Sequence, residues 1–292
     1  MIIAIASGKG GTGKTTVAVN LALALLQSAD ETLKNMRLSF GDCDVEEPNA
    51  ALFLKPLLNQ KETVFLKIPE VDVTLCTQCG RCAQICEYHA LAVIGERVLV
   101  FPELCHGCGS CILECPEGAV HEVPHIIGSI ERGRVGSMGF VHGMLEIGAA
   151  LSPPIIRRVK RWAIDGARDQ LVILDAPPGN ACPVVQTLRG SDYALMVTEP
   201  TPFGLHDLEI AVEVARQELG LPVGVVINRD GVGDDGVDDF CRAEGIPILM
   251  RIPLDRRIAE AYARGEALIT ALPEYRKRFL ALYRRIREEA TR

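Results

Sequence analysis

The apolar run Ile2-Ile3-Ala4-Ile5-Ala6 is followed, after Ser7, by Gly8-Lys9-Gly10-Gly11-Thr12-Gly13-Lys14-Thr15-Thr16. The second stretch fits the phosphate-loop pattern G-x-x-x-x-G-K-[ST], and it lies where that pattern is meaningful, between a predicted strand and a predicted helix. Its glycines let successive backbone N–H groups turn toward an anion, and the following helix directs its positive N-terminus to the same place. The sequence therefore predicts a nucleotide site on an α/β fold.

The side chains of this loop have separate expected roles. Lys14 is expected to reach the β- and γ-phosphates, and the Thr15 hydroxyl is expected to bind Mg²⁺. The other loop residues predicted to contact the nucleotide are Gly8, Gly10, Gly11, Thr12, Gly13 and Thr16. Lys9 is a second lysine in the loop, and an ordinary phosphate loop needs only the one at Lys14.

Two acidic stretches follow predicted strands. The first stretch contains Asp42 and Asp44 and follows the strand predicted at 37–41. The second begins at Asp175, directly after the apolar run Leu171-Val172-Ile173-Leu174, and continues as a D-x-P-P-G turn that ends at Gly179. Phosphoryl transfer needs a fixed Mg²⁺ and a water aimed at the γ-phosphate, and carboxylates in these places are suited to both tasks.

The double-lysine loop and the two acidic stretches resemble the deviant Walker A motif and the two switches of the MinD/ParA/Mrp group of ATPases. The resemblance implies an ATP-dependent homodimer in which Lys9 contacts the nucleotide held by the opposite subunit. It also implies that Asp44 positions the attacking water and that Asp175 holds a Mg²⁺-bound water. The catalytic residues would then be Lys9, Lys14, Asp44 and Asp175.

The same resemblance assigns four further positions. Asp42 is expected to support Mg²⁺, and the Gly179 N–H is expected to bind the γ-phosphate. Asn228, at the end of an apolar strand, would bond the adenine, and Pro253 would lie against the base.

Cysteines form the second prominent pattern. The chain has 11 of them in 292 residues, and the spacing C-x2-C-x2-C-x3-C occurs twice between residues 76 and 115. Each cysteine of the second run lies 29 residues after its counterpart, and Gly80 and Gly109 repeat with them. The N-terminus has no signal-peptide pattern, which predicts a cytoplasmic protein with reduced thiols. The pattern therefore predicts metal binding and not disulfides.

The ligand sets follow from a property of this spacing, in which the fourth cysteine serves the other cluster. One [4Fe–4S] cluster is thus assigned to Cys76, Cys79, Cys82 and Cys115, and a second to Cys86, Cys105, Cys108 and Cys111. Zinc is less favoured, because zinc sites normally use separated C-x2-C pairs. Cys43, Cys182 and Cys241 lack such spacing and are expected to be structural thiols.

Residues 70 to 125 resemble the bacterial two-cluster ferredoxins. The segment departs from that family at Glu87, because the residue after the fourth cysteine is usually proline, as it is at Pro116. Together the motifs resemble MinD-superfamily ATPases that carry an inserted ferredoxin domain.

The predicted fold is α/β, with a mostly parallel, doubly wound phosphate-loop sheet and an inserted small α+β ferredoxin-like domain. The ATPase domain is predicted to comprise 1–70 and 126–292, and the insertion 71–125. Strands are expected at 2–6, 37–41, 171–175, 193–198, 222–227 and 247–250, and helices at 14–28, 153–167, 204–218, 235–244 and 256–264. The glycine-rich stretch 128–149 is expected to form strands and loops without assigned chemistry.

Charge and hydropathy argue against nucleic acids and membranes as partners of this chain. Lys and Arg total 31 against 38 Asp and Glu, a net charge of −7, which argues against a nucleic-acid-binding surface. The sequence has no apolar run long enough to span a membrane. A basic helix near the C-terminus carries the narrow apolar stripe Tyr275, Phe279, Leu282 and Ile286, and docking on the scaffold is favoured over membrane contact.

These patterns predict an ATPase whose nucleotide state is coupled to two [4Fe–4S] clusters. ATP-gated electron transfer to an unidentified redox partner is favoured, because ferredoxin-type loops wrap their clusters. An assembly or insertion factor that passes clusters to an accepting protein is the first alternative. A positional switch of the ParA/MinD kind, with structural or sensory clusters, is the second.

Overall fold

The computed structural model describes residues 1–34, 36–166 and 169–291. Within these residues nine strands form one sheet in the order β11-β10-β9-β1-β8-β2-β7-β6-β3. The strands are β1 (Ile2–Ala6), β2 (Arg37–Asp42), β3 (Leu57–Val71), β6 (Val120–Val135), β7 (Met138–Leu145), β8 (Gln170–Asp175), β9 (Tyr193–Thr198), β10 (Val223–Asp230) and β11 (Ile248–Pro253). Neighbours from β11 to β7 pair in parallel, whereas β7, β6 and β3 pair antiparallel.

Helices cover both faces of the parallel part, because its strands alternate apolar side chains between two cores. Ile3 and Ile5 of β1 belong to one core, and Ala4 and Ala6 belong to the other. The first core is closed by α1 (Lys14–Leu26), α3 (Ala50–Leu54), α11 (Leu268–Ala271) and α12 (Tyr275–Ala290). The second is closed by α6 (Pro153–Ala163), α7 (Cys182–Leu188), α8 (Pro202–Glu213) and α9 (Gly236–Ala243).

The predicted elements agree with this arrangement, apart from their ends. The helix expected at 153–167 ends at Ala163, and the one expected at 204–218 begins at Pro202 and becomes a π-helical segment, η2 (Val214–Glu218). The remaining helices outside the cysteine segment are α2 (Glu31–Lys34) and α10 (Arg256–Ala263).

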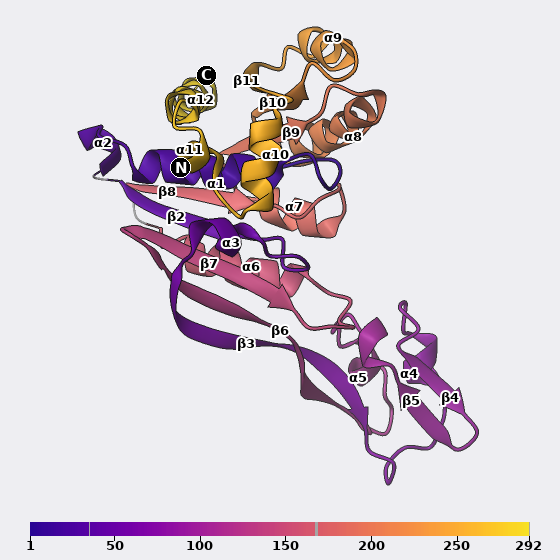
Figure 1. Ribbon diagram of the computed structural model, residues 1–292. Helices are drawn as coiled ribbons and strands as arrows, with labels where there is room; N and C mark the ends of the chain where they lie inside the picture. The colour runs from indigo at the N-terminus through magenta and orange to yellow at the C-terminus, as the bar shows by residue number, and fades with distance from the viewer. Residues whose placement is uncertain (35, 167–168, 292) are drawn as a thin grey trace.

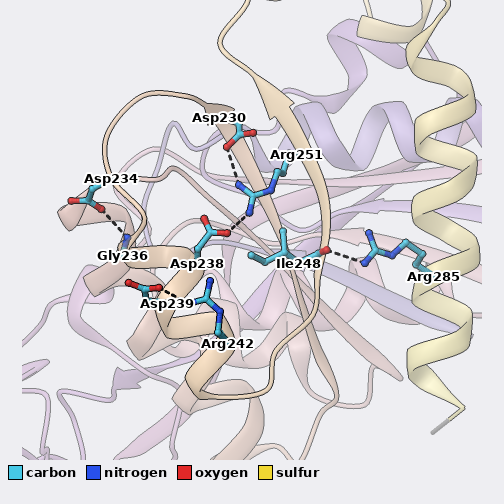
Figure 2. A network of polar contacts seen from close by, with 9 residues as sticks. All are labelled: Asp230, Asp234, Gly236, Asp238, Asp239, Arg242, Ile248, Arg251 and Arg285. Carbon is cyan, nitrogen blue, oxygen red and sulfur yellow. Dashed lines mark hydrogen bonds and ion pairs between the residues drawn. The ribbon is translucent and has the colours of Figure 1, made fainter.

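The C-terminal helix α12 is docked on the scaffold. The apolar stripe Tyr275, Phe279, Leu282 and Ile286 is buried in the first core. Arg285 reaches across to β11, where its Nη2 donates to the Ile248 carbonyl at 3.0 Å (Figure 2). Of the helices described, none is both long and apolar enough to cross a membrane.

A long antiparallel arm, β3 paired with β6, extends the sheet beyond the helical layers (Figure 1). It carries the cysteine segment at its far end, remote from α12. That segment contains α4 (Arg81–Gln84), β4 (Leu91–Ile94), β5 (Arg97–Val100), a 3₁₀ turn η1 (Pro102–Leu104) and α5 (Ser110–Leu113). Two continuous strands therefore join the cysteine segment to the sheet.

The 29-residue repeat is visible in the backbone of this segment. Gly80 precedes α4 with φ 80° and ψ −3°, and Gly109 precedes α5 with φ 77° and ψ −3°. Glycine suits both positions because this left-handed conformation is costly for other residues.

Candidate functional site

The phosphate loop joins β1 to α1 and lies beside the end of β10. The Asn228 amide donates from Nδ2 to the Thr12 carbonyl at 2.7 Å. Gly13 lies so close that a Cβ there would be 2.3 Å from Asn228 Nδ2. Asn228, which the family resemblance assigns to adenine, thus also braces the loop backbone.

Thr15 and Asp175 meet at the carboxyl ends of adjacent parallel strands, because β1 pairs with β8 in the register Ile5 to Asp175. The Thr15 hydroxyl donates to Asp175 Oδ2 at 2.6 Å. Burial raises the pKa of Asp175, while Lys14 and the Thr15 bond lower it. Among the described side chains, Asp175 Oδ1 is buried without a hydrogen-bond partner. A hydroxyl beside such an oxygen fits Mg²⁺, which prefers oxygen ligands.

Asp44 faces the same place from the loop after β2. Its Oδ2 lies 3.9 Å from Lys14 Nζ, and both side chains are largely buried. Burial raises the Asp44 pKa to about 6, although Lys14 opposes that shift. The carboxylate form is the stronger acceptor of a hydrogen bond from a water.

Asp42 is buried one strand away, and its two oxygens bind the loop itself. Oδ1 accepts from the Asp44 N–H at 3.1 Å, and Oδ2 accepts from the Ala50 N–H at 3.1 Å. Burial, followed by the charge of Asp175, raises its pKa well above the usual value. Asp42 thus ties β2 to the start of α3 and fixes the backbone that presents Asp44.

Lys9 projects from the mouth of the loop toward Glu199, at 3.7 Å from its Oε2. Glu199 also pairs with Arg229, whose Nη1 lies 2.6 Å from Oε1. Only 9% of Glu199 is exposed, so it is a largely buried carboxylate between two cations. Sequence reasoning gave Glu199 no role, and its place after β9 was the only available signal.

The two other positions assigned by resemblance lie at strand ends. The Gly179 N–H donates to the Ser7 carbonyl at 3.1 Å, which places the D-x-P-P-G turn against the phosphate loop. Pro253 ends β11 and is exposed.

Arg251 was not predicted from the sequence. Its Nη1 lies 3.0 Å from Asp230 Oδ1, and its Nη2 pairs with Asp238 of α9 (Figure 2). It thereby fixes the loop that follows Asn228.

A buried lysine of α6, also unpredicted, lies near Cys43 and binds the end of α7. Lys160 Nζ donates to the carbonyls of Gln186 and Thr187 at 3.0 and 2.8 Å, at the end of α7. Burial lowers its pKa, and the nearby Cys43 opposes this. Cys43 lies between Asp42 and Asp44, is fully buried and is close enough to Lys160 for their charges to interact, so Lys160 lies near the first acidic stretch and caps the helix after the second.

The cysteines of the far segment meet in two crossed sets. Burial raises the Cys82 pKa, and Cys76, Cys115 and Cys79 lie close enough to raise it further. Burial likewise raises the Cys111 pKa to about 11, with contributions from Cys105, Cys108 and Cys86. The same four thiols, Cys86, Cys105, Cys108 and Cys111, line one small cavity.

Backbone amides point at the sulfurs, as a charged sulfur site requires. The N–H groups of Ala90 and Ala119 donate to Cys86 Sγ and Cys115 Sγ, each at 3.2 Å, in equivalent places of the repeat. In the described ranges, no group of three or more His, Cys, Asp or Glu side chains could hold a metal ion. A cubane cluster places one thiolate on each of its four irons, so its ligands surround a cube rather than a point. The donor set fits such clusters.

Two backbone hydrogen bonds lead from the residue after Asp44 to a loop that shares a crevice with one of these sets. The Leu145 N–H, at the end of β7, donates to the Val45 carbonyl at 2.8 Å, and the Glu146 N–H donates to Ile127 of β6 at 2.9 Å. The loop that begins at Glu146 lines a crevice together with Cys105.

The chain matches a nucleotide-binding family and is similar to known proteins along nearly its whole length. Residues 3–269 match the family model described as the CobQ/CobB/MinD/ParA nucleotide binding domain. An uncharacterized protein of Methanocaldococcus jannaschii is 30% identical, over 99% of this chain and 97% of its own. The cytosolic Fe-S cluster assembly factor NUBP2 homolog of Culex quinquefasciatus is 25% identical, over 94% and 91%.

The fold has solved counterparts. The septum site-determining protein MinD complexed with Mg-ADP, from Pyrococcus horikoshii, aligns with a TM-score of 0.56 and 20% identity, over 96% of this chain and 93% of that one. The large, mostly parallel α/β sheet is therefore of the MinD type, as the sequence predicted.

Proposed function

This chain belongs to the CobQ/CobB/MinD/ParA nucleotide-binding family, and we propose that it is an ATPase that acts on iron–sulfur clusters. It binds and hydrolyses ATP, and the nucleotide state acts on two [4Fe–4S] clusters held by an inserted ferredoxin-type domain, residues 71–125. The observation that carries this proposal is the path from Asp44 through Val45, Leu145 and Glu146 to the crevice beside Cys105.

Hydrolysis follows from the groups at the sheet edge. Lys14 neutralises the phosphates, and Thr15 and Asp175 would hold Mg²⁺ through the hydroxyl and the unpaired Oδ1. Mg²⁺ supplies charge neutralisation at the transferring phosphoryl group. Asp44 accepts a hydrogen bond from the attacking water and aims it, while Asp42 holds the loop in place.

The nucleotide site is completed by a second subunit. Lys9 leaves Glu199 and contacts the nucleotide of the partner, so that ATP favours a homodimer. The resemblance of the double-lysine loop to that of MinD/ParA/Mrp ATPases supports this step.

We further propose that the clusters serve iron–sulfur assembly or carriage. The similarity to a cytosolic Fe-S cluster assembly factor along nearly the whole chain favours this role over the electron transfer that the sequence favoured. Electron transfer stands as the second candidate, because buried cysteines such as Cys105 and Cys111 are suited to retain a redox cluster.

One experiment separates these roles. Protein carrying ⁵⁵Fe-labelled clusters is incubated anaerobically with an apo-ferredoxin, with ATP, with ADP and without nucleotide. Assembly predicts that label moves to the acceptor at a nucleotide-dependent rate. Retention of the label in every condition, together with electron delivery to a redox dye, would leave electron transfer as the function. Protein without iron after anaerobic preparation would contradict both.

A further inference from the structure

The two cysteine sets are equivalent in the repeat but differ in their surroundings. The inner set is Cys86, Cys105, Cys108 and Cys111, and the outer set is Cys76, Cys79, Cys82 and Cys115. In the inner set Cys86, Cys105 and Cys111 are buried, and Cys108 is exposed. In the outer set Cys82 is buried, Cys76 and Cys115 are half-buried, and Cys79 is exposed.

The inner set lies against the arm of the sheet. Gly107, between two inner cysteines, is packed so that a Cβ would lie 2.7 Å from Leu66 Cδ1 and 3.0 Å from the Lys67 carbonyl. The equivalent outer residue is Gln78, which has a similar backbone conformation, with φ 55° against 65°. Gln78 is exposed, and its amide donates back to the Cys76 carbonyl at 2.6 Å. The outer loop therefore faces solvent where the inner loop faces protein.

Two aromatic rings flank the inner set as well. Tyr88 and His106 stack with ring centroids 3.5 Å apart and line the cavity of the inner cysteines. Their equivalents 29 residues away are Glu117 and Thr77; all four side chains are exposed, but only the inner pair is aromatic. Neither Glu117 nor Thr77 can form such a stack, so the outer set lacks this pair of rings.

We infer that the two sets have different tasks: the inner set retains a resident cluster, and the outer set is the exchange site that accepts and releases a [4Fe–4S] cluster. The inference rests on the proposed role in iron–sulfur assembly or carriage, and it adds which of the two sets exchanges its cluster. In exchange the cluster moves whole, without change of oxidation state. Bonds from iron to the outer thiolates break as bonds to the acceptor's thiolates form, and the vacated thiolates take up the protons that the acceptor's thiols release.

Release of iron to a chelator tests this division. Anaerobic protein with intact clusters is mixed with bathophenanthroline disulfonate and excess dithionite, which keeps the released iron as Fe(II), and iron release is followed by absorbance. We expect two phases of about four irons each. The slow phase should be at least tenfold slower, because chelator reaches the inner set poorly.

Matched variants assign the phases. Cys79→Ser and Cys108→Ser change equivalent, exposed ligands, so their effects on folding are comparable. Cys79→Ser should leave only the slow phase, and Cys108→Ser only the fast one. Replacing the ring pair by its outer equivalents, Tyr88→Glu with His106→Thr, should accelerate the slow phase at least threefold.

The outcomes are distinguishable. Equal release from both sets, or faster release from the inner set, would overturn the inference while leaving an iron–sulfur ATPase intact. If either cysteine variant does not fold, transfer from the unmodified protein to apo-ferredoxin decides. It should stop at about half of the iron, whereas complete transfer contradicts a retained cluster.

Discussion

The nucleotide end of the sheet and the cysteine segment assemble their functional groups in different ways. Thr15 and Asp175 are bonded although 160 positions separate them, because β1 and β8 are neighbours. The cysteines instead lie within one short stretch and use a repeated local loop. The nucleotide site therefore depends on the integrity of the whole sheet, whereas each cysteine set depends mainly on its own ligands. The β3–β6 arm and the loop after β7 join the two regions.

The largest expected effect tests whether the regions are separable. Lys14→Ala should lower ATP affinity by about 3 kcal/mol or more, because it removes one partner of a buried charge pair with phosphate. Hydrolysis should be abolished, while iron content stays unchanged. Calorimetric titration with ATP and iron counting measure both quantities, with the exposed Lys277→Ala as control. Parallel loss of iron would show that the regions fold as one unit.

The second prediction concerns the chemistry of the nucleotide end, where Asp44 is proposed to aim the attacking water. Asp44→Asn should leave ATP bound but slow hydrolysis by about 10²- to 10⁴-fold, the usual contribution of a positioned acid–base group. The Asp44 pKa is raised by burial to about 6, so the wild-type kcat/KM should increase with pH up to that value and then level off. A phosphate-release assay from pH 5 to 8 checks this. Near-normal turnover of the variant would move the role to Asp42 or Asp175.

The crossed ligands give a prediction confined to the cysteine end. Cys86→Ser should damage the inner cluster, although Cys86 directly follows outer ligands in sequence, and Cys115→Ser should damage the outer one. Each variant should lose about half of the iron, with no change in ATP affinity. Mössbauer spectra of ⁵⁷Fe-labelled protein identify the surviving cluster. The assignment fails if Cys86→Ser loses the cluster that remains in Cys108→Ser.

The smallest expected effect concerns Lys9. Glu199→Gln removes the charge that holds Lys9 at 3.7 Å, so the lysine should be freer to reach a nucleotide. We expect the ATP-dependent dimer to form at a few-fold lower protein concentration, as a partly exposed ion pair contributes about 0.2 to 1 kcal/mol. Sedimentation measures it, and the exposed Glu244→Gln is the control. A weaker dimer would mean that Glu199 supports the interface.

Most of the parallel sheet could be predicted, because strands such as β1 and β8 are apolar runs followed by recognisable motifs, the phosphate loop and the D-x-P-P-G turn. The arm could not: β3 carries many exposed polar side chains, and such a strand is recognisable only once its partner β6 is known. Glu199 and Lys160 were missed for a related reason. Their partners are distant in sequence, so only the topology reveals them.

At the cysteine end the spacing alone predicted which thiols group together. It could not predict that the sets differ in burial, because Leu66 of the arm packs on Gly107, whereas the equivalent Gln78 is exposed. The repeat predicts the ligands, and we expect the surroundings to determine what each set can do.

We expect dimer closure over ATP to act on the cysteine segment through the contacts of Val45, Leu145 and Glu146 within each subunit. The most direct measurement compares wild type and Lys9→Ala by sedimentation and redox titration of the clusters, each with ADP and with a non-hydrolysable ATP analogue. The wild type should dimerise with the ATP analogue and show a shifted cluster potential, because exposure and nearby charge set that potential. Lys9→Ala should bind the analogue yet stay monomeric with an unshifted potential. A wild-type protein that remains monomeric, with identical potentials in both nucleotides, would contradict the account.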